Sequence, residues 1–226
     1  VQDKVGADPT GLPFNSVIAL ELHGGKPLSP LVNAGAIATT SLINAENTEQ
    51  RWQRILHIQQ QLAGEQVALS DEVNQSEQTT NFHNRAIAWL LYSAGYLYCD
   101  AMEACDVYTR QCSTLINTIE LATLGATLAA GGVNPLTHKR VLQADNVPYI
   151  LAEMMMEGLY GRSGDWAYRV GLPGKSGVGG GILAVVPGVM GIAAFSPPLD
   201  EEGNSVRGQK MVASVAKQLG YNVFKG

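Results

Sequence analysis

The sequence predicts an α/β protein in an α+β arrangement, in which a helical lobe is followed by antiparallel strands and a C-terminal helix. Apolar residues recur at helical spacing through most of residues 1–160, whereas Gly, Val and Ile dominate after Gly161. A Pro-Gly turn separates the apolar runs 182–186 and 189–195, which predicts a β-hairpin. Strands do not alternate with helices, so the pattern favours an antiparallel sheet.

The helical lobe begins with an irregular region. Residues 9–30 are rich in Gly, Pro, Asn and Ser around an apolar patch at 17–22, which predicts loops around one short extended segment. An Ala-rich helix is predicted over 33–44. Asn47 then caps a helix that Gly64 ends.

The middle of the lobe continues as helices. Ser70 is expected to cap a short helix that runs through Glu77. Apolar positions at helical spacing then predict a longer helix that ends near Asp100, and a further helix covers 102–113.

Local sequence motifs divide the second half of the chain into helices and strands. A capping-box pattern at 117–120 begins a helix that the glycines at 131–132 stop. A helix with proline in its first turn covers 146–158. A strand over 174–179 precedes the hairpin, and a helix over 206–219 closes the chain.

Composition limits the classes of function. The 226 residues are 46% hydrophobic and 15% charged, which predicts an ordinary globular protein of one domain or two interleaved lobes. Net charge is -5 and the 15 Lys and Arg residues form no runs, so a small molecule is favoured as partner over nucleic acid or anionic lipid. No apolar run reaches the roughly 18 residues that span a bilayer. Three cysteines without metal-ligand spacing indicate reduced thiols and a cytoplasmic location.

The sharpest local motif is the glycine-rich segment from Lys175 to Gly181. Glycine lets a ligand approach the backbone closely, so the segment suits a Val178 N–H that points at a developing oxyanion. A β-bulge or a tight strand crossing explains the same glycines, and spacing alone does not separate the two hypotheses. A phosphate-binding loop is not predicted, because the first glycine of that motif would fall at Arg169.

A Lys-Ser-Gly that opens a strand late in the chain resembles the K-[ST]-G element of serine β-lactamases and penicillin-binding proteins. Those enzymes also need an S-x-x-K motif. The one match here runs from Ser214 to Lys217 in the last predicted helix, whereas the nucleophile of that architecture precedes the helical lobe. We interpret the match as a coincidence.

Other polar residues have ordinary explanations when each is taken alone. Asn33, Glu77 and Asn84 suit exposed helix faces and caps. Tyr108 suits a buried tyrosine, and it would act as a base only beside a cation that lowers its pKa from about 10. Cys112 is interpreted as a structural thiol, since no partner for a nucleophile is evident. The four histidines match no metal-binding pattern, so no metal is predicted.

Four blocks in series resemble the bacterial-type, serine-dependent glutaminase family, and the resemblance runs nearly end to end. They are 33–37 (NAGAI), 76–77 (SE) with 84–86 (NRA), Tyr108 with 111–113 (QCS), and 175–178 (KSGV) with 180–182 (GGI). The chain looks close to a glutaminase of enteric bacteria. The resemblance implies a β-lactamase- or transpeptidase-like fold and a single domain over 1–226, mainly helical over 1–160.

The resemblance also implies the site. The residues that match substrate-binding positions are Asn33, Glu77, Asn84, Tyr108, Tyr160 and the backbone of Val178. L-Glutamine carries an ammonium, a carboxylate and an amide, so its site needs one fixed anion, supplied by Glu77, and several neutral donors. The resemblance further implies that Tyr108 shuttles protons and that the Val178 N–H helps to bind the oxyanion.

The implied reaction is hydrolysis of L-glutamine to L-glutamate and ammonia through a serine γ-glutamyl ester, without metal or organic cofactor. A homo-oligomer, a tetramer by family analogy, is implied as well. The serine and its lysine are expected ahead of residue 1, so the chain is expected to lack an N-terminal part. Two other hypotheses stay open: a β-lactam-recognising serine acyl transferase, and an inactive helical binding or assembly module.

Overall fold

The computed structural model describes residues 1–225 and divides into two compact units. Unit 1 comprises Val1–Ile58 and Val67–Leu115, and unit 2 comprises Gln59–Gln66 and Ile116–Gly226. The helix α3 (Thr48–Ala63) contributes residues to both units.

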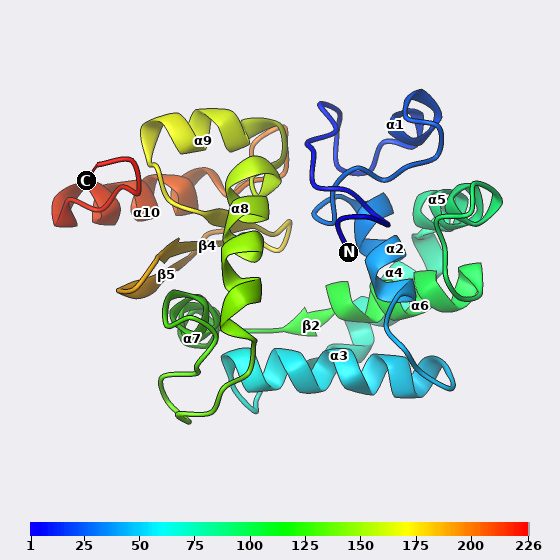
Figure 1. The fold of residues 1–226 in the computed structure, drawn as a ribbon, viewed down its shortest axis with the longest axis horizontal. Helices are drawn as coiled ribbons and strands as arrows, with labels where there is room; N and C mark the ends of the chain where they lie inside the picture. Colours follow the sequence, from blue (N-terminus) through cyan, green and yellow to red (C-terminus); the bar gives the residue numbers. More distant parts are fainter. Residues whose placement is uncertain (226) are drawn as a thin grey trace. The chain divides into compact units, whose positions relative to one another are not determined.

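Unit 1 is helical, with one short antiparallel strand pair. Besides α3 it contains α1 (Val17–Leu22), α2 (Asn33–Ser41), α4 (Asp71–Thr80), α5 (Phe82–Ser93), α6 (Ala101–Cys112), β1 (Ala68–Leu69) and β2 (Thr114–Leu115). Figure 1 shows α2, α5 and α6 side by side, and buried residues such as Ile37, Ile87 and Ala104 join them in one apolar core. This core supports the candidate site residues of unit 1.

Helix caps that the sequence predicts are present in unit 1. The Asn47 side chain accepts a hydrogen bond from the backbone N–H of Gln50 at 2.9 Å, at the start of α3. The Ser70 hydroxyl accepts from the N–H of Val73 at 3.3 Å, at the start of α4. Both bonds satisfy N–H groups that a helix leaves unpaired in its first turn.

Two sequence predictions for unit 1 were wrong. The segment predicted as extended is the helix α1, because the Ser16 hydroxyl caps it by accepting from the Ala19 N–H at 3.2 Å. Helix α5 ends well before Asp100, since Gly95 adopts a left-handed φ of 78° and turns the chain. Asp100 instead caps the next helix, α6.

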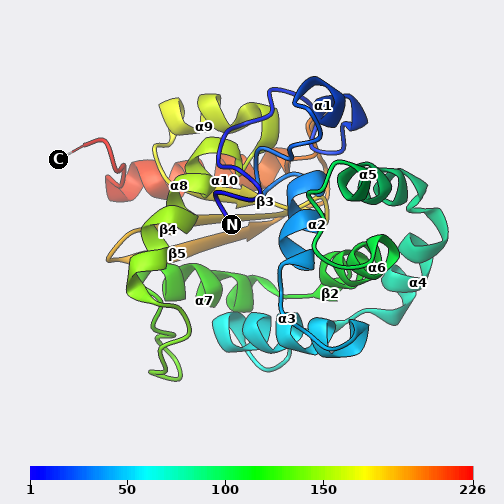
Figure 2. The ribbon, with the colours of Figure 1, turned by 45° about the vertical axis from the view of Figure 1, so that its right-hand side comes forward.

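Unit 2 is a three-stranded antiparallel sheet covered by helices. Its elements are α7 (Thr118–Ala129), η1 (Ala144–Asn146), α8 (Val147–Glu157), η2 (Tyr160–Arg162), α9 (Ser163–Arg169), β3 (Gly174–Ser176), β4 (Gly181–Val186), β5 (Met190–Phe195) and α10 (Val206–Leu219). The strand order is β3-β4-β5, with Lys175 opposite Leu183 and Ala184 opposite Ile192. Figure 2 shows α7 along one face of this sheet and α10 along the other.

The central strand β4 is buried on both faces. Ile182 and Ala184 belong to the core shared with α10, whereas Leu183 and Val185 belong to the core shared with α7. Alternate side chains of a strand point to opposite faces, so both faces here need apolar residues. This burial explains why β4 has a continuous apolar run instead of an alternating one.

Most predicted elements of unit 2 are confirmed. Both hydrogen bonds of the capping box between Asn117 and Glu120 are present, the hairpin forms β4 and β5, and the last helix has the predicted bounds. The strand predicted over 174–179 is shorter, because the glycines after Ser176 form a turn in which Gly180 has a φ of 99°. Helix α9 was not predicted; its short length gives little periodicity to detect.

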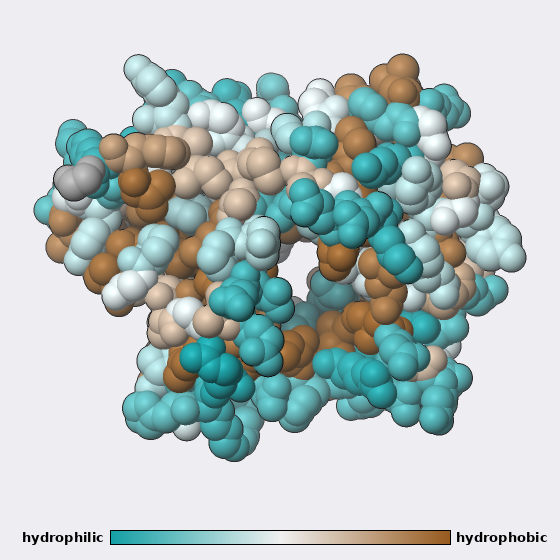
Figure 3. Space-filling view, viewed as in Figure 1, coloured by the Kyte–Doolittle hydropathy of each residue, from teal (hydrophilic) through white to brown (hydrophobic). Residues whose placement is uncertain are grey.

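The surface mixes polar and apolar side chains. Figure 3 shows hydrophilic and hydrophobic residues interspersed on one face, and both kinds reach the surface around the C-terminal end of α10. Among residues 1–225, no helix has the length and apolar character needed to cross a membrane.

Candidate active site

Three of the residues assigned by the resemblance form one hydrogen-bonded network in unit 1. The Tyr108 hydroxyl donates to Oδ1 of Asn33 at 2.9 Å, and Nδ2 of Asn33 donates to Oδ1 of Asn84 at 2.8 Å. One end of the Asn33 amide accepts and the other donates, so both bonds together define its orientation. Tyr108 is only 8% exposed, which places its hydroxyl at the edge of the apolar core.

The backbone around Asn33 positions this network. Asn33 is the first residue of α2, and its N–H donates to the carbonyl oxygen of Phe14 at 2.9 Å. A Cβ on Gly35 would lie 1.7 Å from the carbonyl oxygen of Ser29, so only glycine lets the first turn of α2 pack this closely on the preceding loop. The Gly in the NAGAI block therefore has a structural role beside the asparagine.

A second polar contact joins the helices next to the network. Nδ2 of Asn81 donates to the Thr109 hydroxyl at 2.9 Å, and Asn81 is only 6% exposed. Asn81 follows α4, and Thr109 lies beside Tyr108 on α6, so the bond ties the α4–α5 junction to the helix that carries Tyr108. Sequence reasoning missed Asn81, whose position between two helices was its one available signal.

Glu77 is not joined to the network. It lies on the exposed face of α4, and its carboxylate has no side-chain or backbone partner within the described part of the chain. Glu49, Glu103 and Asp106 pair with Arg110 or Arg51, whereas Glu77 makes no ion pair in the described residues. An unpaired carboxylate suits the binding of a cationic group.

In unit 2 the structure brings together Tyr160 and Lys175. The Lys175 Nζ lies 4.4 Å from the centroid of the Tyr160 ring and 3.4 Å from its hydroxyl. It also donates to the carbonyl oxygens of Ser176 at 2.6 Å and Gly158 at 3.3 Å. A cation above an aromatic face and close to a hydroxyl holds the ring in place.

Tyr160 has an unusual backbone conformation. Its φ of 53° lies in the left-handed region, which is uncommon for a residue other than glycine and costs about 1 kcal/mol or more. It begins the short helix η2, directly after Leu159, whose side chain is fully buried. Strained residues of this kind cluster at functional sites.

The backbone N–H of Val178 is presented by the glycine turn that follows β3. Gly177 donates to the carbonyl oxygen of Gly181 at 3.0 Å and Gly180 donates to that of Gly177 at 2.9 Å, but the Val178 N–H has no acceptor in residues 1–225. The Val178 side chain is 57% exposed. An N–H without a partner is available to an external acceptor.

The glycines of this turn have two different roles. A Cβ on Gly180 would lie 2.8 Å from the carbonyl oxygen of Ser196, so this glycine permits a tight strand crossing. Gly177 and Gly179 have open space where a Cβ would be. Close packing therefore accounts for Gly180, while the open positions leave room for a ligand beside Val178.

The Ser-x-x-K match on α10 lies outside both parts of the site. Ser214 and Lys217 are exposed, and the Ser214 hydroxyl accepts from Nε2 of Gln218 at 3.0 Å. Its hydroxyl is a surface group and not an activated nucleophile. Over the described range, no group of three His, Cys, Asp or Glu side chains is arranged to hold a metal ion.

Comparison with known proteins identifies the family to which this chain is similar. The family model described as "Glutaminase" matches residues 1–224. "Glutaminase 1" of Shigella flexneri is 99% identical over all 226 residues, and "Glutaminase 1" of Escherichia coli (strain K12) is 98% identical. The chain spans 73% of the length of each of these relatives.

Solved structures agree with the sequence relatives. A "Probable glutaminase ybaS" has a TM-score of 0.99 at 98% identity, over 100% of this chain and 73% of that one. The Bacillus subtilis glutaminase YbgJ, solved as a covalent complex with 5-oxo-L-norleucine after reaction with 6-diazo-5-oxo-L-norleucine, has a TM-score of 0.87 at 30% identity, over 98% and 73%. The predicted fold class is confirmed by these matches, and the chain belongs to the glutaminase family.

Proposed function

We propose that this chain carries the substrate-binding residues of an enzyme that hydrolyses L-glutamine to L-glutamate and ammonia. One observation carries the proposal: the hydrogen-bonded network of Tyr108, Asn33 and Asn84, all three at positions that the family resemblance assigns to the substrate. The mutual hydrogen bonds fix the orientation of these neutral polar groups, as a binding site for a polar ligand requires. Membership of the glutaminase family supports the same conclusion.

Each group of L-glutamine has a proposed partner. Glu77 binds the α-ammonium, since its carboxylate has no partner elsewhere in the described residues. Nδ2 of Asn84 has no acceptor within residues 1–225 and is available to the α-carboxylate. The charge of Glu77 makes the site selective for an α-amino acid over a simple amide.

The proposed reaction uses a serine and a lysine that the resemblance places ahead of residue 1. The serine oxygen bonds to the carbon of the side-chain amide, and the Val178 N–H donates to the oxyanion that forms. The C–N bond then breaks, and Tyr108 passes the serine's proton to the departing ammonia. Water attacks the γ-glutamyl ester, which yields L-glutamate and restores the serine.

The remaining features of the proposal come from the resemblance and, for the location, from the three cysteines. In it, residues 1–226 form one glutaminase domain that acts in the cytoplasm as a homo-oligomer, with a tetramer as the expected state. Light scattering coupled to size-exclusion chromatography measures that state. A monomer at micromolar concentration would contradict it.

The experiment that tests the proposed function is ammonia release from L-glutamine, measured with a polypeptide that includes the upstream serine and lysine. Glutaramate, which lacks the α-ammonium but keeps the amide, is the matched control substrate. We expect a kcat/KM for glutamine at least about tenfold above that for glutaramate, and we expect Glu77→Gln to remove most of this difference. Absence of ammonia release, together with acylation by a fluorescent penicillin, would favour the β-lactam hypothesis instead.

A further inference from the structure

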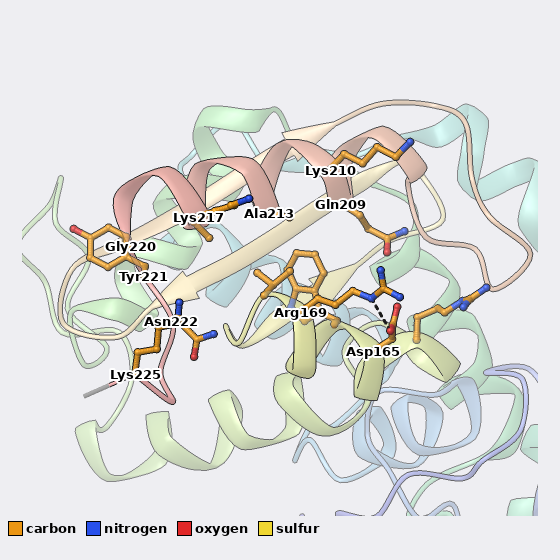
Figure 4. Close-up of a pocket in the computed structure, with 14 residues that line it drawn as sticks. Asp165, Arg169, Gln209, Lys210, Ala213, Lys217, Gly220, Tyr221, Asn222 and Lys225 are labelled. Atoms are coloured by element: carbon orange, nitrogen blue, oxygen red, sulfur yellow. Dashed lines mark hydrogen bonds and ion pairs between the residues drawn. The ribbon is translucent and has the colours of Figure 1, made fainter.

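Unit 2 contains a pocket of about 600 Å³ that shares no residue with the candidate active site. It lies between α9, α10 and the segment that follows α10 (Figure 4). This volume falls in the range of small-molecule sites, which is several hundred Å³. The pocket is therefore a candidate site for a second ligand.

Two helices form the long walls of the pocket. Arg162, Asp165 and Arg169 recur at helical spacing along α9 and its start, and Lys210, Ala213 and Lys217 do so along α10. Lys210 and Lys217 are seven residues apart, which is about 10 Å along a helix axis. The walls therefore hold an elongated ligand better than a compact ion.

Positive charge is concentrated in this pocket. Five of the 15 Lys and Arg residues of the chain line it, namely Arg162, Arg169, Lys210, Lys217 and Lys225, against the single carboxylate of Asp165. The lining carries a net charge of +4, five positive charges and one negative, in a chain of net charge -5. These cations are dispersed in the sequence, and the fold gathers them.

Most of these cations lack a partner. Asp165 pairs with Arg169, with 2.8 Å between its Oδ1 and the arginine Nε. The other four have no carboxylate partner in the part of the chain that the structure describes. Mutual repulsion of unpaired cations is relieved when an anion binds.

Buried apolar residues form the floor of the pocket. Trp166, Val170 and Ala216 are buried there, and the indole N–H of Trp166 already donates to the carbonyl oxygen of Leu172 at 2.8 Å. The segment that follows α10 forms the third wall. It is anchored, because the N–H of Val223 donates to the carbonyl oxygen of Gly171 at 2.8 Å. A ligand here meets an apolar surface below and cations around the rim.

We propose that this pocket binds a small organic polyanion, with its organic body on the apolar floor and its anionic groups on the cations of α9 and α10. The volume of the pocket and the spacing of Lys210 and Lys217 along α10 favour an elongated organic anion over inorganic phosphate. Phosphorylated molecules and polycarboxylates share the required chemistry. Guanidinium and ammonium groups pair with both kinds of anion.

Calorimetric titration of the purified protein with ATP, citrate and inorganic phosphate at constant ionic strength tests the proposal. We expect saturable binding of ATP or citrate at one site, at least about tenfold tighter than binding of phosphate. Tighter binding of ATP assigns phosphorylated ligands, and tighter binding of citrate assigns polycarboxylates. Lack of saturable binding of both organic anions would overturn the proposal.

Variants of α10 localise the binding. Lys210→Glu combined with Lys217→Glu should weaken the affinity at least about tenfold, whereas Arg207→Glu, an exposed cation of α10 outside the pocket, should change it less than about twofold. Equal weakening of the affinity by both variants would show unspecific attraction and refute the site.

Ala213→Phe is a second test, which fills the pocket without changing its charge. It should abolish binding, and the thermal unfolding temperature shows whether the variant protein is folded. Unchanged binding in a folded Ala213→Phe protein would contradict the proposal.

Discussion

The candidate site residues of unit 1 contribute side chains, whereas those of unit 2 contribute mostly backbone groups. In unit 1, the hydroxyl of Tyr108 and the amides of Asn33 and Asn84 bond to each other above a helical core. In unit 2, the Val178 N–H projects from a glycine turn, and Tyr160 has a left-handed backbone. Substitutions should therefore act through chemical identity in unit 1 and through backbone geometry in unit 2.

The largest loss of activity is expected when the hydroxyl of Tyr108 in unit 1 is removed. Tyr108→Phe keeps the ring in the core but deletes the hydroxyl that donates to Asn33, so proton transfer is lost. We expect kcat for glutamine to fall at least about 100-fold. Tyr168→Phe is the matched control, because Tyr168 is 89% exposed and is not a residue of the candidate site. Normal turnover by Tyr108→Phe would exclude its assigned role.

The corresponding test in unit 2 distinguishes a role of the Val178 backbone N–H from a role of the Val178 side chain. Gly180→Ala places a Cβ 2.8 Å from the Ser196 carbonyl oxygen at a φ of 99°, so the turn must shift and the Val178 N–H with it. A roughly tenfold or greater loss of kcat/KM is expected, since a displaced oxyanion donor costs at least that much. Val178→Ala keeps the N–H and should stay within about twofold of the wild type. A large loss in Val178→Ala would show that the side chain, and not the backbone, is used.

A smaller effect is expected where unit 2 does use a side chain. Lys175→Met removes the cation above the Tyr160 ring, an interaction worth about 1 kcal/mol, so KM for glutamine should rise about fivefold. Lys175→Arg should recover part of the loss, because a guanidinium also stacks on an aromatic ring. Lys139→Met, at an exposed position, should have no effect. An unchanged KM in Lys175→Met would contradict a role of the Lys175–Tyr160 contact in substrate binding.

A further test concerns the rigidity of the unit 1 core and alters no residue of the candidate site. Burial raises the pKa of Cys105 to about 11, whereas Cys112 is exposed. A raised pKa means that the thiolate forms only at high pH, so at pH 8 roughly one Cys105 in a thousand is reactive. A thiol reagent should therefore modify Cys112 well before Cys105, as mass spectrometry of the peptides would report. Equal rates would mean that the core below Tyr108 opens readily.

Local signals were sufficient for most elements of the fold. Asn47 and Ser70 cap helices within three residues of their own position, and a hairpin follows from two apolar runs and a turn, so both are predictable. The helix α1 was mistaken for an extended segment because loop-forming residues surround a single capped turn. Helix α9 lies between two glycine-rich stretches and is too short for a periodic pattern.

Local sequence signals were not sufficient to predict the candidate site. Tyr108 lies 75 residues from Asn33, so no spacing rule predicts their hydrogen bond, and the resemblance to a family was the one indication. The cation above Tyr160 was not predicted, since it depends on how η2 meets β3. The basic pocket was missed for the same reason, because its cations come from three segments that the fold brings together.

A crystal structure of the enzyme with bound L-glutamate tests the central claim most directly. We predict that the Glu77 carboxylate contacts the ammonium of the ligand and that Asn84 contacts its α-carboxylate. The γ-carboxylate should lie within hydrogen-bond distance of the Tyr108 hydroxyl and the Val178 N–H. Glutamate bound elsewhere, with Glu77 and Tyr108 making no contact to it, would contradict the account.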